Sequence, residues 1–157
     1  LVEVGRERLE ARRDVELRLG VDLQLPEPYL PEPALRLSFY KRLAACDSEE
    51  GLTELLEEMA DRYGPAPAQV DALAEAQRVR MAARGAGVAA MIRRGRKWRL
   101  RLDPAVVPSA GLVEAVTDRP GAQLSPDGEI IFPIGDGGPG VGEVLEFLGR
   151  LQPDVGS

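Results

Sequence analysis

Carboxylates form the densest group of chemically active side chains in this sequence. The helix expected from Asp47 to Asp61 holds seven of them, and Glu54, Glu58 and Asp61 follow one another at i, i+4 and i+7 and so share one stripe. Paired carboxylates carry out acid–base chemistry or hold Mg²⁺. That chemistry uses a cleft, and the sequence offers no second acid cluster to face this stripe. A carboxylate-based metal enzyme remains an alternative hypothesis, and the missing second acid cluster argues against it.

The position of two of these acids favours a different role. Acids at the start of a helix are stabilised by its macrodipole, which accounts for Asp47, Glu49 and Glu50. Glu58 and Asp61 lie at the C-terminal end, where the macrodipole disfavours negative charge. We infer that something other than helix stability keeps them there, and a basic partner surface would do so.

A second charged group is basic and predicts a strand. Six cations fall within nine residues: Arg93, Arg94, Arg96, Lys97, Arg99 and Arg101. Alternation places Lys97, Arg99 and Arg101 on one face of the strand, where they could follow a phosphate backbone. The same alternation places Trp98 on the opposite face with the apolar residues, so we expect it in the core. A solvated strand face is the simpler interpretation of such a charge run.

The rest of the composition narrows the chemistry. The sequence has no histidine, which removes the commonest general base and zinc ligand, and its one cysteine, Cys46, can form no disulfide within the chain. The net charge of −6 argues against a dedicated nucleic-acid domain. We therefore expect no catalytic, metal-binding or cofactor-binding residues in this chain.

A glycine-rich motif lies near the C-terminal end of the sequence. The residues from Gly135 to Gly140 match the dinucleotide fingerprint G-x-G-x-x-G. Pro139 removes one of the amides that would face a pyrophosphate, and the chain ends before a second strand and its ribose-binding acid could follow. We interpret the segment as a flexible connection.

Helices and strands must position these groups, and the pattern predicts an α+β fold. Residues 15–25 alternate apolar and polar side chains, which predicts a half-buried strand. The prolines of residues 26–32 favour an extended, polyproline-like crossover. Three helices should follow, beginning near Pro33, Asp47 and Pro67. Asp47 and Glu50 are expected to cap the start of the second helix, and Gly64 is expected to end it.

The last seventy residues predict a smaller α/β half. Strands are expected at 88–92 and around Trp98, then a short helix at 110–116, a hairpin turning at 125–128 and a final helix at 141–151. No apolar run is long enough for a membrane helix, no signal peptide opens the chain, and its first residue is Leu1. We expect a cytoplasmic piece of a longer protein.

Three segments carry a resemblance to a known family. Tyr29–Glu32 (YLPE), Leu35–Ala44 (LRLSFYKRLA) and Glu58–Pro67 (EMADRYGPAP) resemble the C-terminal domain of the bacterial transcription-repair coupling factor (Mfd), whose pattern is roughly Y-I-P-D, L-Y-K-R-I and E-L-I-D-R-F-G-x-x-P. The resemblance covers about residues 15–90. It implies a linker or helical tail at 1–14 from a preceding motor and one domain over 15–157, mainly helical at 15–86 and α/β at 87–157.

The resemblance implies a regulatory domain without an active site. In that family an ATP-driven DNA translocase of the helicase superfamily, which uses ATP and Mg²⁺, displaces stalled RNA polymerase and recruits excision repair. The C-terminal domain packs on an N-terminal UvrB-like module and masks the surface that binds UvrA. This carries over to an interdomain interface at Glu54, Glu58, Asp61 and Arg62. The alternative is an accessory module that binds nucleic acid through Arg94, Arg96, Lys97, Arg99 and Arg101.

Overall fold

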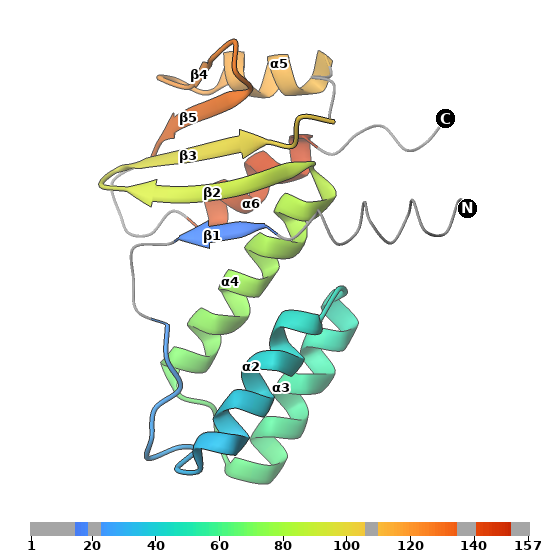
Figure 1. Cartoon of the computed structure of the whole chain (residues 1–157), viewed down its shortest axis with the longest axis vertical. Coiled ribbons are helices and arrows are strands. Elements are labelled where there is room, and N and C mark those ends of the chain that lie inside the picture. Colours follow the sequence, from blue (N-terminus) through green and yellow to red (C-terminus); the bar gives the residue numbers. More distant parts are fainter. Residues whose placement is uncertain (1–14, 19–22, 106–109, 135–140, 152–157) are drawn as a thin grey trace, which may run out of the picture. The chain divides into compact units, whose positions relative to one another are not determined.

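The chain folds as two compact units, one mainly helical and one built around a sheet (Figure 1). The computed structural model describes residues 15–18, 23–105, 110–134 and 141–151, so the expected tail at 1–14 and the glycine-rich loop at 135–140 lie outside the described residues. The helical unit comprises Val21–Met81. The sheet unit comprises Leu1–Gly20 together with Ala82–Ser157.

The helical unit contains the three expected helices, and local signals account for their ends. Helix α2 (Pro33–Ala45) begins at a proline, whose missing N–H costs nothing in a first turn. Helix α3 (Glu49–Tyr63) ends at Gly64, which has a φ of 90°. Helix α4 (Ala68–Gly85) follows Pro67 and runs on into the sheet unit.

Apolar faces of these helices share one core. Its buried members are Leu25, Leu30, Phe39, Leu43, Leu52, Leu55, Met59, Val70, Leu73 and Ala74. Their spacing along each helix repeats every three or four residues, as an amphipathic helix requires.

The proline-rich segment departs from the expected extended crossover. Residues 26–30 form a turn in which the backbone amides of Tyr29 and Leu30 both donate to the Pro26 carbonyl at 3.1 Å. The prediction of a continuous polyproline-like stretch was wrong because these two bonds close the chain on itself. The turn buries Leu30 almost completely, and the Tyr29 hydroxyl donates to the Gly64 carbonyl at 2.9 Å.

The described residues of the sheet unit form a sheet of five strands in the order β1-β2-β3-β5-β4. They are β1 (Glu16–Arg18), β2 (Val88–Arg94), β3 (Lys97–Leu102), β4 (Gln123–Leu124) and β5 (Glu129–Pro133). β1 pairs with β2 in parallel, and the other pairs are antiparallel. The strand expected over 15–25 is thus wrong in its extent, because the described residues 23–25 form no ladder. Its paired part belongs to the sheet and not to the helical half.

Helices α5 (Ala110–Asp118) and α6 (Val141–Leu151) complete the sheet unit, and in Figure 1 α6 lies behind the strands. Trp98, Leu100 and Phe132 are fully buried on one face of the sheet. On this face the Phe132 ring stacks on Phe147 of α6, and the two ring centroids are 4.9 Å apart. The predicted hairpin and the α+β class are confirmed. Among the described helices, none has the length and apolarity to cross a bilayer.

Candidate functional site

Helix α3 carries the acidic candidate site, and its ends are well defined. Its N-cap is Ser48, whose hydroxyl accepts from the Gly51 amide at 3.1 Å, and not Asp47 as the sequence predicted. Serine is among the strongest N-cap residues because its short side chain reaches the free amides of the first turn. The capped helix buries Leu52, Leu55 and Met59, which leaves its acids toward solvent or beside α2.

Glu58 has a basic partner within its own unit. It accepts a hydrogen bond from Arg42 of α2, which also forms an ion pair with it. This hydrogen bond holds the pKa of Glu58 below its ordinary value of 4.5, and the charge of Arg62 contributes to the lowering. The Arg42 pair therefore explains an acid near the C-terminal end of a helix without any outside partner.

Asp61 is in a different situation, and so are three other acids of the same helix. Glu50, Glu54, Glu57 and Asp61 are exposed and have no hydrogen-bond or ion-pair partner among the described residues. Their spacing is i, i+4, i+7 and i+11, which places all four along one line of the helix surface. We name these four residues the acidic stripe.

The acidic stripe differs in two members from the set that the sequence indicated. Glu54 and Asp61 lie in it, whereas Glu58 is engaged by α2, and Arg62 is exposed beside Asp61. Glu50 and Glu57 were missed as candidates. Their spacing to Glu54 and Asp61 was visible in the sequence, but Glu50 had been explained as a helix-start acid.

Glu54 and Glu58 lie beside a hollow in the helical unit. A hollow of about 240 Å³ is lined by Arg42, Cys46, Gly51, Glu54, Leu55 and Glu58. Burial raises the pKa of the Cys46 thiol above its ordinary value of 9.0, so the thiol stays protonated at neutral pH. No three acidic or thiol side chains in the described part of the chain converge as a metal site requires, so Glu54, Glu58 and Asp61 do not form the metal centre considered as an alternative.

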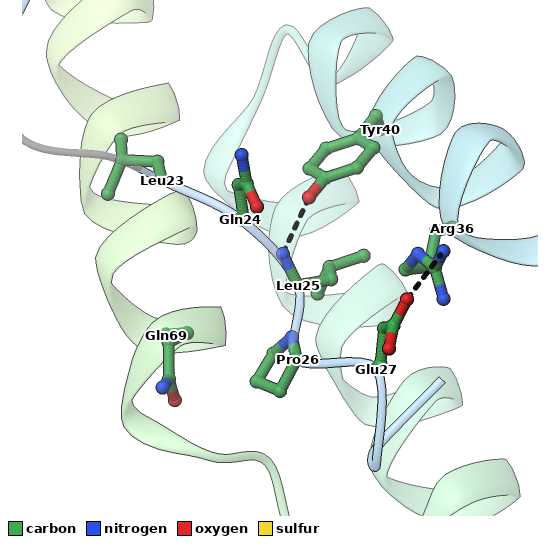
Figure 2. A pocket seen from close by; sticks show the side chains of 8 residues that line it. All are labelled: Leu23, Gln24, Leu25, Pro26, Glu27, Arg36, Tyr40 and Gln69. Atoms are coloured by element: carbon green, nitrogen blue, oxygen red, sulfur yellow. Dashed lines mark hydrogen bonds and ion pairs between the residues drawn. The ribbon is translucent and has the colours of Figure 1, made fainter. Parts of the chain in front are cut away.

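A larger hollow lies between the segment at 23–27 and α2, and Figure 2 shows the eight side chains that line it. Its volume is about 760 Å³. The Tyr40 hydroxyl accepts from the Leu25 amide at 2.5 Å, and Arg36 lies 3.9 Å from Glu27. Arg36 also donates to the Leu30 carbonyl at 2.7 Å. These polar groups hold the irregular segment against α2, so we interpret the hollow as structural.

The basic candidates lie on strands β2 and β3 and the turn between them. Lys97, Arg99 and Arg101 alternate with buried side chains along β3, and Arg94 lies opposite Lys97 on β2. Arg96 lies in the two-residue turn with Gly95, whose φ of 60° suits glycine. Trp98 is fully buried, as predicted, and is not part of a nucleic-acid stacking platform.

Comparisons with known proteins identify the family. The family model for the TRCF domain matches residues 19–109. The transcription-repair-coupling factor of Mycobacterium bovis is 34% identical over 113 residues, which are 72% of this chain. The protein of the same name from Haemophilus influenzae is 46% identical over 61 residues, or 39% of this chain. The one from Escherichia coli is 34% identical over 76 residues, or 48% of this chain. These matches span only 9%, 5% and 7% of the relatives' own lengths.

A solved structure agrees in fold. The crystal structure of the C-terminal domain of a transcription-repair coupling factor superposes with a TM-score of 0.76 at 22% identity, over 88% of this chain and 91% of that chain. The resemblance seen in the YLPE and EMADRYGPAP motifs is thereby confirmed. Because the family model covers more than half of its residues, the chain belongs to the TRCF domain family.

Proposed function

We propose that this chain is the non-catalytic regulatory domain of a transcription-repair coupling factor and that its acidic stripe is a docking surface for another part of the same protein. The family and the curated relatives support the setting. The parent protein would be a cytoplasmic, ATP-dependent DNA translocase that displaces stalled RNA polymerase. ATP and Mg²⁺ would act in its motor and not in this domain.

The observation that carries the proposal is the electrostatic cost of the stripe. Glu50–Glu54, Glu54–Glu57 and Glu57–Asp61 are like-charge neighbours at i+3 or i+4, and each such pair destabilises a helix by about 0.2–0.5 kcal/mol. The helical unit has six cations against eleven carboxylates among its described residues. Because acids are in excess, the cations of this unit do not offset the repulsion within the acidic stripe. A cationic partner surface would relieve it.

The proposed partner is the N-terminal UvrB-like module of the parent protein, and the contact would mask the surface that binds UvrA. Exposed ion pairs contribute about 0–1 kcal/mol each, so four of them can favour a closed state by a few kcal/mol. About 2 kcal/mol corresponds to roughly a 30-fold excess of closed over open molecules. Such a contact holds the protein silent, yet movement of a motor can release it.

Glu58 and Arg62 lie on the same helix as the acidic stripe but are not members of it. The shared apolar core packs α3 on α2, and the Arg42–Glu58 pair adds a polar link between the same two helices. Arg62 lies next to Asp61 at the same end of α3 and is exposed. It is available to a carboxylate of the partner, which would make that end of the contact reciprocal.

A binding titration of this chain against the isolated UvrB-like module tests the proposal. Neutralising Glu54→Gln with Asp61→Asn should weaken binding at low salt and reduce its salt dependence. The matched control, Glu32→Gln with Asp71→Asn, removes the same charge from exposed positions outside the stripe and should bind as the parent does.

In the full-length protein, the stripe variant should bind UvrA more tightly than the parent, because the masked surface is uncovered more often. Equal affinity of both double variants for the UvrB-like module would contradict the stripe as the docking surface. Failure of the parent chain to bind the module at any salt concentration would contradict the proposed function itself.

A further inference from the structure

The sheet of the second unit has one face that α6 covers and an opposite face that is rich in cations. Since Phe132 and Trp98 face α6, the neighbouring side chains along the same strands point the other way. We name this opposite side the open face. Its described members are Glu16, Arg18, Ala90, Ile92, Arg94, Lys97, Arg99, Arg101, Gln123, Glu129, Ile131 and Pro133.

Both carboxylates of the open face are already paired. Glu129 lies 2.8 Å from Arg99, and Glu16 lies 2.9 Å from Arg18. The remaining cations, Arg94, Lys97 and Arg101, are exposed, and the described residues offer them no ion-pair partner. Among the described residues, the face therefore keeps three positive charges without an ion-pair partner.

Two of these cations repel each other in the folded state. Arg94 and Lys97 occupy directly opposite positions on β2 and β3, and like charges placed so are destabilising. The described residues of the sheet unit hold ten cations against eight carboxylates, although the whole chain has a net charge of −6. Positive charge is thus concentrated in this unit and gathered on one side of its sheet.

The spacing and chemistry of the open face fit a row of phosphates. Alternate residues of a strand are about 6.6–6.8 Å apart, so Lys97, Arg99 and Arg101 form a regular line that Arg94 widens at one end. The aromatic side chains Trp98 and Phe132 are buried on the other side, so the described members of the face offer no aromatic platform for stacking unpaired bases. Ile92 and Ile131 are half-buried between the cations, whose aliphatic stems can cover them.

We propose that the open face binds the phosphate backbone of a nucleic-acid duplex without sequence preference. A duplex carries one charge per about 1.7 Å of its axis, which makes it the densest common source of phosphate for a flat row of cations. This surface lies on a different unit from the acidic stripe, so each can be altered by its own substitutions.

Fluorescence anisotropy of a labelled, mixed-sequence DNA duplex, titrated with this chain, measures the binding. Three phosphate contacts predict a log–log salt slope of about −2.7, or roughly 40-fold weaker binding at about 200 mM than at about 50 mM salt. The variant Lys97→Gln with Arg101→Gln should reduce the slope to about −0.9 and lower the affinity at low salt.

The control variant Lys41→Gln with Arg150→Gln removes the same charge from exposed residues that are not members of the open face, and it should keep the parent's slope and affinity. Circular dichroism checks that both variants fold. The proposal is overturned if the duplex is not bound at about 50 mM salt. It is also overturned if both variants lose affinity equally, or if single-stranded DNA binds more tightly than the duplex. Binding of poly-glutamate but not DNA would show instead that the face takes an acidic protein.

Discussion

The acidic stripe of α3 leads to a prediction about stability that is independent of any partner. Replacing Glu54 by Gln and Asp61 by Asn removes all three like-charge contacts of the stripe, those joining Glu50 to Glu54, Glu54 to Glu57 and Glu57 to Asp61. At about 0.2–0.5 kcal/mol each, these contacts account for about 0.6–1.5 kcal/mol. Removing a negative charge from the last turn of the helix adds about 0.3–1 kcal/mol. The variant should therefore be more stable than the parent by about 1–2.5 kcal/mol.

Thermal unfolding followed by circular dichroism at low salt measures this gain. In a chain of this length each kcal/mol raises the midpoint by about 2–4 °C. Salt should reduce the gain, since the Debye length falls to about 3 Å at 1 M. Neither substitution changes helix propensity appreciably, because Gln and Asn rank close to Glu and Asp.

A control variant that loses the same charge should show no gain in stability. Glu32→Gln with Asp71→Asn removes the same charge from the N-terminal ends of α2 and α4, where the macrodipole favours acids, and should leave stability unchanged or lower. If the Glu54/Asp61 variant is no more stable than the parent at low salt, the carboxylates do not repel one another as inferred. The electrostatic reason for assigning a docking role to the stripe would then fail.

Three further predictions concern contacts inside the helical unit. In Arg42→Gln, the pKa of Glu58 should rise toward 4.5 in a carbon NMR titration. Because the folded pKa is depressed, the stability from this pair is fully present above pH 4.5 and is lost as pH falls through the folded pKa, so the urea midpoints of variant and parent should converge in acid. Ser48→Ala should cost about 1 kcal/mol in urea unfolding while Ser48→Asp keeps the cap, and equal losses would show that the cap contributes nothing. Gln77 is buried and its amide donates to the Cys46 carbonyl at 2.9 Å, so Gln77→Leu should cost about 1–3 kcal/mol, and an unchanged midpoint would contradict this.

The elements that the sequence predicted well depend on short-range signals. Pro33 and the Gly64-Pro65 pair mark helix ends within a few residues, and the alternation around Trp98 shows which side of β3 is buried. The strand at 15–25 failed because alternation describes a half-buried surface and not a hydrogen-bonding partner. Its partner β2 lies about seventy residues further along the chain, and no local pattern specifies a pairing over that separation.

One part of the candidate site could be predicted from the sequence and another part could not. The acidic stripe is a property of one helix, so its spacing could be read from the sequence. The partner of Glu58 could not, because Arg42 comes from another helix and meets it only through the way α2 packs on α3. Glu58 and Asp61 therefore look equivalent in the pattern of one helix, although only Glu58 has an ion-pair partner among the described residues.

The placement of β1 has a consequence for the order in which the protein is made. β1 leaves the ribosome before the whole helical unit, yet its partner β2 emerges only after that unit is complete. At about 5–20 residues per second, this strand waits roughly 4–14 s for its neighbour. During that interval the helical unit can finish folding from its own local contacts. Once folded, it brings the ends of its segment to a fixed separation, which lowers the entropy cost of closing the parallel pair. The helical unit would then act as a folded spacer that helps to close the first edge of the sheet.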